Sequence, residues 1–237
     1  MDVLTSFFSS LFTLGDPSAS GVSIPLVLEF GAVLAGAVSG ALTACTMKMD
    51  LIGVCVLAIA SSLGGGLVRD MILSDQGVYM LDYPQAMLCC IIVAFLAFFF
   101  SSLIKRFERS VAFFDIVSVA LFSVTGADKA LMAGYGVYAG VLMGVLTAVG
   151  GGAIRDIIVG RVPGIFRASN FYAVCSLAGA LVYCLLVENH MVKGWAAAAC
   201  TVVVLALRYL SLHYNWHTCA PIDLAERLSE KREHMDR

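Results

Sequence analysis

Seven stretches of the chain are almost free of charged residues and approach the length needed to cross a lipid bilayer. They run over approximately residues 25–46, 51–73, 84–104, 111–131, 136–159, 169–187 and 192–212. A helix needs about 20 apolar residues to span the hydrocarbon core. Within that core every backbone polar group must be bonded inside the protein, which favours the α-helix. The pattern predicts an all-α membrane protein with seven transmembrane helices.

The two ends of the chain differ from these stretches. Residues 1–24 carry an apolar cluster but no Lys or Arg, so they lack the positively charged start of a signal peptide. We interpret them as an interfacial helix or a disordered lead-in. Residues 213–237 mix acidic and basic side chains around Leu224 and Leu228, a pattern typical of a solvated helix in a charged cytoplasmic tail.

Composition agrees with a membrane protein and narrows the classes of function. Hydrophobic residues make up 60% of the chain, charged residues 14%, and the mean hydropathy is +0.90, whereas soluble domains hold roughly 45–50% apolar and about 25% charged residues. The net charge of −2 argues against nucleic-acid binding. Seven of the eight cysteines fall in apolar stretches, where they are expected as small hydrophobic side chains rather than disulfides.

Basic residues are distributed unevenly between the two sides of the predicted membrane. If successive helices alternate in direction, Arg69, Lys129 and Lys193 lie on one side and the other twelve Lys and Arg residues on the opposite side. Loops rich in Lys and Arg stay in the cytoplasm. The sequence therefore predicts a multi-pass protein of the bacterial inner membrane, with its N-terminus outside and its C-terminus in the cytoplasm.

An internal repeat organises the first six predicted helices. Gly64-Gly65-Gly66-Leu-Val-Arg69-Asp70 recurs as Gly150-Gly151-Gly152-Ala-Ile-Arg155-Asp156, at an offset of 86 residues. The same offset aligns Glu29 with Asp115 and Ser39-Gly40-Ala41 with Thr125-Gly126-Ala127. Because three helices separate equivalent points, the second copy enters the membrane from the opposite face. We predict two inverted repeats, residues 25–104 and 111–187, an arrangement found in transporters with sites between the repeats.

Three successive glycines inside a predicted transmembrane helix invite two explanations. Small residues let helix backbones pack closely in lipid. A run of three also exposes backbone groups or permits a bend, which is tolerated only beside protein or a water-filled cavity. We favour the bend and cavity, and predict that the glycines of both runs belong to a pore, namely Gly64, Gly65, Gly66, Gly150, Gly151 and Gly152.

Charged and hydroxyl side chains near the glycine runs are the other candidate site residues. Intramembrane charges usually pair or line a pathway, so the charged candidates for a pathway or a gate are Arg69, Asp70, Arg155, Asp156, Lys129, Asp128, Glu29 and Asp115. The hydroxyl candidates for lining a pore are Ser39, Thr125, Ser61 and Thr147. Adjacent residues point about 100° apart on a helix, so each Arg need not pair with its own Asp. For both Arg-Asp motifs an interfacial position that marks the helix end is an alternative, and for Glu29 and Asp115 a helix-capping role is one.

These motifs resemble those of the trimeric intracellular cation channel superfamily, in its bacterial branch of glycine-transporter-domain proteins. The resemblance covers residues 29–214 and rests on the acid-led starts at Glu29 and Asp115, on Thr125-Gly-Ala-Asp-Lys-Ala, and on both glycine blocks, the second of which continues to Pro163. It implies homotrimers of seven-helix subunits. Each subunit would hold its own pore between the inverted repeats, with bends at the glycines.

The expected activity is passive conduction of monovalent cations, chiefly K⁺, because glycine-exposed backbone, hydroxyls and a few acids suit a weakly hydrated cation. The alternative is a secondary transporter of a small amino acid such as glycine, bound at helix ends beside the glycine breaks. Membrane lipid is the other expected partner.

No enzymatic activity and no cofactor are expected, because the glycine runs lack the endings of phosphate-binding or dinucleotide-binding loops. No metal site is expected either. His213 and His217 lie near Cys219 without a fourth ligand, and fit an interfacial aromatic belt better.

Overall fold

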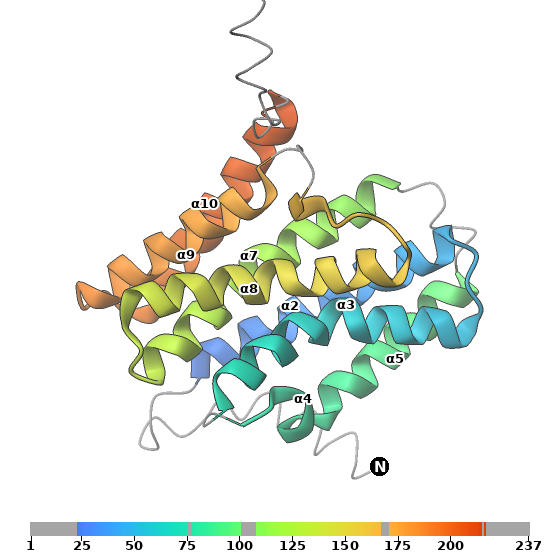
Figure 1. Ribbon diagram of the computed structural model, residues 1–237, viewed down its shortest axis with the longest axis horizontal. Coiled ribbons are helices and arrows are strands. Elements are labelled where there is room, and N and C mark those ends of the chain that lie inside the picture. Colours follow the sequence, from blue (N-terminus) through green and yellow to red (C-terminus); the bar gives the residue numbers. More distant parts are fainter. Residues whose placement is uncertain (1–22, 75–76, 101–107, 167–170, 215, 217–237) are drawn as a thin grey trace, which may run out of the picture.

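The computed structural model describes residues 23–74, 77–100, 108–166, 171–214 and 216, and this part of the chain is helical. Its elements are α2 (Ser23–Thr46), α3 (Leu51–Ile72), α4 (Tyr79–Asp82), α5 (Pro84–Phe99), α7 (Glu108–Met132), α8 (Gly136–Ile158), the 3₁₀ turn η2 (Gly164–Phe166), α9 (Tyr172–Glu188) and α10 (Lys193–His213) (Figure 1). The expectation of an all-α protein is confirmed for these residues.

Five of these helices are long and apolar enough to cross a membrane, namely α2, α3, α7, α8 and α10. The helices α5 and α9 are apolar as well but span 16 and 17 residues. Parts of the corresponding predicted spans, 84–104 and 169–187, lie outside the described residues. The crossing of all seven helices therefore stays a prediction. The lead-in 1–22 and the tail 217–237 also lie outside the described residues.

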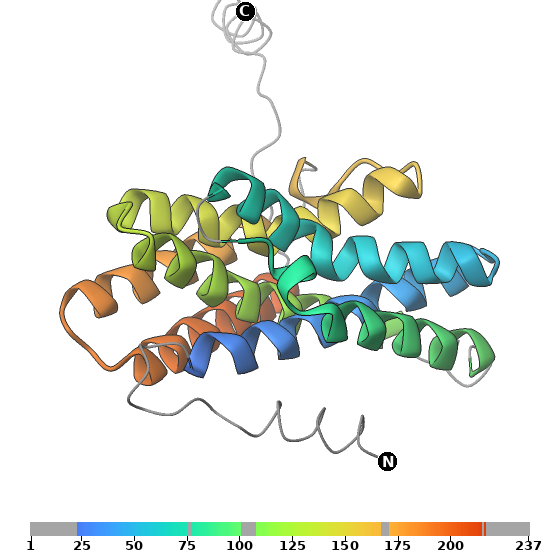
Figure 2. The ribbon, with the colours of Figure 1, turned by 90° about the horizontal axis from the view of Figure 1, so that it is seen from below.

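Four helices form the centre of the bundle, and the other three flank it. In the centre α3 packs against α8, α2 against α3, and α7 against both α2 and α8. On one flank α5 contacts α2 and α3, while α9 contacts α7 and α8 on the other. Figures 1 and 2 show these flanking helices on opposite sides of the molecule. The helix α10 packs on α9 and α7, so it covers the second repeat.

Helix boundaries follow from local sequence. Asp50 precedes α3, and its carboxylate accepts a hydrogen bond from the Gly53 amide at 2.8 Å, which satisfies one of the free N–H groups of the first turn. The turn between α7 and α8 contains Gly134, and α8 starts at Gly136; their φ angles are 82° and 75°. These angles lie in the left-handed region that glycine adopts at little cost, so the chain can reverse direction within a few residues.

Glycines occupy the points where the helices of each repeat approach most closely. A Cβ at Gly40 would lie 2.6 Å from the Leu57 carbonyl oxygen, and a Cβ at Gly126 would lie 2.6 Å from the Met143 carbonyl oxygen. Both pairs are related by the 86-residue offset. The same contact thus joins α2 to α3 and α7 to α8, which explains why glycine stands at both positions.

The two glycine runs meet each other at the crossing of α3 and α8. A Cβ at Gly65 would overlap the Thr147 carbonyl oxygen, and a Cβ at Gly151 would overlap the Ser61 carbonyl oxygen. Both helices continue through their runs, α3 to Ile72 and α8 to Ile158. Close packing, the alternative to a bend, accounts for these contacts at the middle glycines.

Candidate functional site

A buried ionic cluster lies at the end of α3 that follows the first glycine run. The Arg69 Nη2 atom lies 2.6 Å from Glu29 Oε1 on α2, and its Nε atom lies 2.7 Å from Asp70 Oδ1. We call Glu29, Arg69 and Asp70 the first-repeat cluster. Arg69 is fully buried, and its Nη1 atom has no hydrogen-bond partner within the described residues. The guanidinium is therefore enclosed by protein and paired with two carboxylates.

Groups from two other segments complete the first-repeat cluster. Lys129, on α7 of the second repeat, places its Nζ atom 2.7 Å from Asp70 Oδ1 and donates to the Gly77 carbonyl oxygen at 3.3 Å. The Tyr79 amide donates to Asp70 Oδ2 at 2.8 Å. Burial raises the pKa of the Tyr79 phenol well above its usual value. Lys129 therefore ties the second repeat to the charged end of the first.

A second cluster stands at the equivalent place in the second repeat. The Arg155 side chain lies 2.8 Å from Asp115 Oδ1 on α7 and 3.0 Å from Asp156 Oδ1. We call Asp115, Arg155 and Asp156 the second-repeat cluster. Arg155 also donates to the Ser39 hydroxyl of α2 at 2.9 Å, and the Gly164 amide donates to Asp156 Oδ2 at 3.2 Å. Arg155 thus reaches across to the first repeat.

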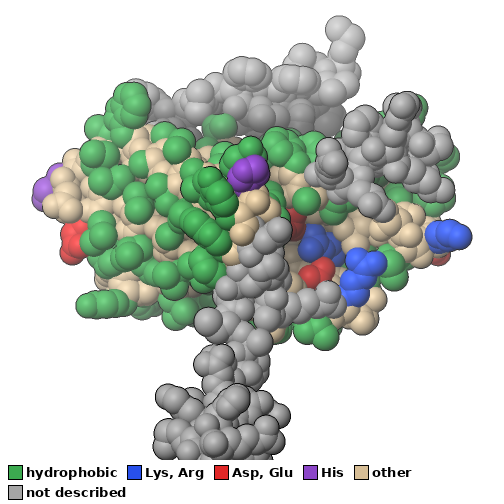
Figure 3. Space-filling model, turned by 90° about the horizontal axis from the view of Figure 1, so that it is seen from above, with side chains coloured by type: hydrophobic (Ala, Val, Ile, Leu, Met, Phe, Trp, Pro, Cys, Tyr) green, Lys and Arg blue, Asp and Glu red, His purple; other side chains and the backbone are tan. Residues whose placement is uncertain are grey.

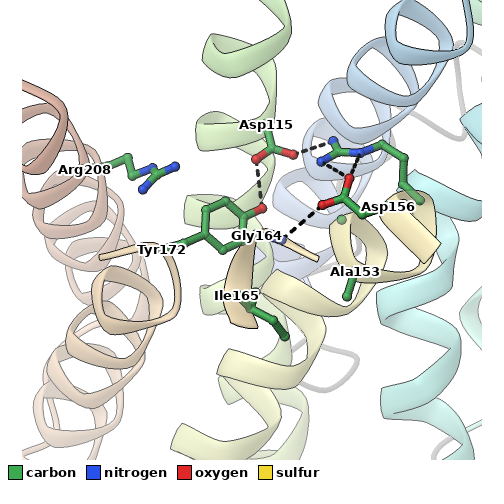
Figure 4. Close-up of a pocket in the computed structure, with 9 residues that line it drawn as sticks. Asp115, Ala153, Asp156, Gly164, Ile165, Tyr172 and Arg208 are labelled. Carbon is green, nitrogen blue, oxygen red and sulfur yellow. Dashed lines mark hydrogen bonds and ion pairs between the residues drawn. The ribbon is translucent and has the colours of Figure 1, made fainter. Parts of the chain in front are cut away.

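A cavity of about 180 Å³ opens beside the second-repeat cluster. Its lining includes Asp115, Arg155 and Asp156 together with Tyr172 and Arg208. The Tyr172 hydroxyl donates to Asp115 Oδ2 at 2.8 Å, and the Arg208 guanidinium carbon lies 4.8 Å from the centre of the Tyr172 ring. Figure 4 shows Tyr172 pointing toward Asp115 and Arg208 extending from α10 toward them.

The two clusters differ in their access to solvent. In the first-repeat cluster the side chains of Arg69 and Asp70 are 0% and 1% exposed. In the second, Arg155 and Asp156 are 12% and 18% exposed. Figure 3 shows a face of the molecule where acidic and basic side chains gather among a mostly hydrophobic surface. The Arg-Asp pair of the second-repeat cluster is therefore the more accessible of the two.

Asp128 belongs to neither cluster. Its Oδ1 atom accepts a hydrogen bond from the Tyr183 hydroxyl at 2.7 Å and lies 2.8 Å from Lys193 Nζ. Its Oδ2 atom is buried without a hydrogen-bond partner in the part of the chain that the structure describes. Because Tyr183 is on α9 and Lys193 begins α10, Asp128 connects both helices to α7.

The hydroxyl candidates are all buried and three of them are bonded. Ser39 contacts Arg155, as described above. Thr147 donates to the Met143 carbonyl oxygen at 2.6 Å, and Thr125 donates to the Phe122 carbonyl oxygen at 3.5 Å. The backbone of Ser61 meets Gly151 at the central crossing. Their role in lining a pore stays a prediction, as does the pore role of the six glycines.

Each Arg pairs with an acid of the neighbouring helix and also with its own Asp, which its Nε atom reaches. One alternative of the sequence-based interpretation needs correction. Capping does not explain Glu29 and Asp115, since α2 begins at Ser23 and α7 at Glu108. Both acids stand about two turns inside their helices.

Four residues that contact the candidate site residues were missed by sequence reasoning. Tyr172 and Tyr183 lie inside an apolar stretch, and Lys193 and Arg208 stand near the two ends of another. The sequence does contain a signal for the tyrosines, because the 86-residue offset aligns them with Ala86 and Ala97. A large polar side chain in one repeat opposite Ala in the other marks a contact that only one repeat makes.

The seven cysteines within the described residues are free, as expected. No group of three potential metal-ligating side chains occurs among the described residues. His217 and Cys219 lie outside them.

Comparison with known proteins places these features in a family. A family model described as "Glycine transporter" matches residues 26–102 and 112–188, two segments that start 86 residues apart, the offset of the sequence repeat. A UPF0126 membrane protein of Deinococcus radiodurans is 37% identical over 185 residues, covering 78% of this chain and 86% of that protein. The UPF0126 inner membrane protein YadS of Escherichia coli is 32% identical over 186 residues, covering 78% and 89%.

Solved structures give the same assignment. The TRIC trimeric intracellular cation channel orthologue from Rhodobacter sphaeroides is 31% identical, with a TM-score of 0.77 over 81% of this chain and 99% of that one. A structure described as "Structural basis for conductance through TRIC cation channels" is 28% identical, with a TM-score of 0.76 over 83% and 97%. These matches show that this multi-pass membrane protein belongs to the Glycine transporter (UPF0126) family within the TRIC superfamily.

Proposed function

We propose that this protein is a membrane channel that conducts monovalent cations, chiefly K⁺, through a path in each subunit. The observation that carries the proposal is the similarity to the Rhodobacter sphaeroides channel, at 31% identity over 99% of that chain. The family model's match to residues 26–102 and 112–188 includes both glycine runs and both charge clusters.

The charge clusters support a path between the two repeats. Each has two acids from neighbouring helices around one arginine, and each follows a glycine run by about one helical turn. Buried charges of this kind are costly in lipid and usually mark a pathway. Because Gly65 and Gly151 bring the two backbones into contact, the path runs beside this crossing, toward Ser39, Ser61, Thr125 and Thr147, whose oxygens can replace part of a cation's hydration shell.

The distribution of charge and the relatives support a membrane, an orientation and an oligomeric state for the channel. The distribution of basic residues supports the bacterial inner membrane, with the N-terminus outside and the C-terminus in the cytoplasm. In this orientation the first-repeat cluster lies near the outer face and the second-repeat cluster near the inner face. The trimeric solved relative supports a homotrimer in membrane lipid.

A secondary transporter of a small amino acid such as glycine is the second candidate. The favouring observation is the cavity of about 180 Å³, whose lining holds both carboxylates and guanidinium groups. These groups match the two charges of a zwitterion, and the matching family model carries the description "Glycine transporter".

Flux measurements on purified protein in liposomes separate the two functions. A channel gives K⁺ flux that follows an imposed voltage, without saturable glycine uptake. Glycine uptake that saturates and depends on a H⁺ or Na⁺ gradient would contradict the channel and support the transporter. Liposomes prepared in the same way without protein give the leak that is subtracted from both fluxes.

A further inference from the structure

Glu29 on α2 and Asp115 on α7 occupy equivalent positions, but the side chains around them differ between the two repeats. Tyr172 of the second repeat corresponds to Ala86 of the first, a fully buried residue on α5. Arg208 has no counterpart, because α10 lies outside both repeats. The Asp115 carboxylate therefore has a phenol donor and a nearby second guanidinium, whereas Glu29 has neither a tyrosine at the equivalent position nor a helix equivalent to α10.

The contacts of Asp115 explain what these extra groups do. Its Oδ1 atom accepts from Arg155 at 2.8 Å and its Oδ2 atom accepts from the Tyr172 hydroxyl at 2.8 Å. Both oxygens are held, so the carboxylate has one orientation relative to the cavity that it lines. The Arg208 guanidinium carbon lies 4.8 Å from the centre of the Tyr172 ring, a favourable distance for a cation–π interaction.

We infer that Tyr172 and Arg208 are positioning residues for Asp115, and that through them α10 sets how strongly the second-repeat end of the protein attracts cations. This inference rests on the proposed cation conduction. The phenol donor draws negative charge away from the cavity, and Arg208 adds a positive charge to its lining. The first-repeat end holds Lys129 of α7 beside Asp70 instead and no group from α10, so a change at Tyr172 or Arg208 acts at one mouth of the path.

The expected size follows from elementary electrostatics. Removing a unit positive charge about 6 Å from a cation in a water-filled mouth raises the local cation concentration about two- to threefold at physiological salt. Because only one mouth changes, current driven from that mouth increases relative to current driven from the other. The readout is therefore the ratio of currents at opposite voltages, a quantity that a general loss of stability or of protein leaves unchanged.

The test records K⁺ currents from the full-length protein in planar bilayers with equal KCl on both sides. Arg208→Gln is expected to shift the current ratio about two- to threefold toward flow from the Asp115 mouth, and Tyr172→Phe to shift it less in the same direction. Asp115→Asn should shift it the opposite way. Arg208→Lys, which keeps the charge, should retain most of the wild-type ratio.

Tyr183→Phe is the matched control, because Tyr183 lies on the same helix and donates to Asp128 at 2.7 Å, away from the cavity lining. It should leave the ratio unchanged. An unaltered ratio in both Arg208→Gln and Tyr172→Phe, or an equal shift in Tyr183→Phe, overturns the inference while a conducting wild type leaves the proposed function standing. A wild type that carries no current overturns the proposed function and this inference together.

Discussion

Alanine at Gly65 should destabilise the protein, whereas alanine at the neighbouring Gly66 should not. A methyl group at Gly65 would overlap the Thr147 carbonyl oxygen and lie 2.9 Å from the Gly151 amide nitrogen. Both are backbone atoms that cannot rotate away. Overpacking of this kind costs typically about 1–3 kcal/mol, and the gain in helix propensity offsets about 1 kcal/mol of it. The net expectation is a loss of about 0–2 kcal/mol.

Gly66 is the matched control because it stands in the same run of the same helix. A methyl group there meets nothing closer than an Arg69 side-chain nitrogen at 3.8 Å, an ordinary contact. Gly66→Ala thus gains helix propensity without a clash, and should leave stability unchanged or raise it by up to about 1 kcal/mol. The two variants receive the same stiffening of α3 and differ only in what the added methyl touches.

Thermal unfolding and K⁺ flux, measured on both variants, separate packing from flexibility. Packing predicts a lower Tm for Gly65→Ala alone, by about 2–4 °C for each kcal/mol in a chain of this size. A flexible hinge predicts altered flux in both variants with little change in Tm. Equal Tm values for Gly65→Ala and Gly66→Ala would refute the reasoning from close contact. Gly151→Ala should behave as Gly65→Ala does. The double variant should lose less stability than the sum of the two single losses, because the two sites share one helix crossing.

Three further predictions concern charge, capping and orientation. Arg69→Met should lower the free energy of unfolding by about 3–5 kcal/mol, because it leaves Glu29 and Asp70 buried without their guanidinium. Arg155→Met should lower it less, because the second-repeat cluster is partly exposed. Unfolding curves of the two variants measure the difference. Asp50→Ala should cost about 1 kcal/mol through the lost cap of α3, with a correspondingly small fall in Tm. A reporter enzyme that is active only outside the cytoplasm, fused after the C-terminal residue, should stay inactive, and activity there would contradict the proposed orientation.

Much of the fold was predictable because its signals are local or periodic. Long apolar runs identify helices such as α3 and α8 whatever their neighbours are. The recurrence of Gly-Gly-Gly-x-x-Arg-Asp at a constant offset reveals equivalent positions without any knowledge of contacts. The need of Arg69 and Arg155 for acidic partners also follows from the sequence, whereas the choice of Glu29 and Asp115 as those partners comes from the structure.

The rest of the site depends on how the helices are placed in space. Nothing in the sequence shows that Gly65 faces Gly151 rather than a cavity, because both explanations require the same residue. The contact between Lys129 and Asp70 joins residues 59 positions apart, and Thr43, the repeat partner of Lys129, gives no hint of it. Arg208 contacts the Tyr172 ring at 4.8 Å, and this contact appears only once α9 and α10 are packed together.

The most direct test of cation conduction is a recording of single wild-type molecules in a planar bilayer with unequal KCl on the two sides. The account predicts discrete current steps whose reversal potential lies near the equilibrium potential of K⁺. Absence of steps, together with saturable glycine uptake by the same preparation in liposomes, would contradict it.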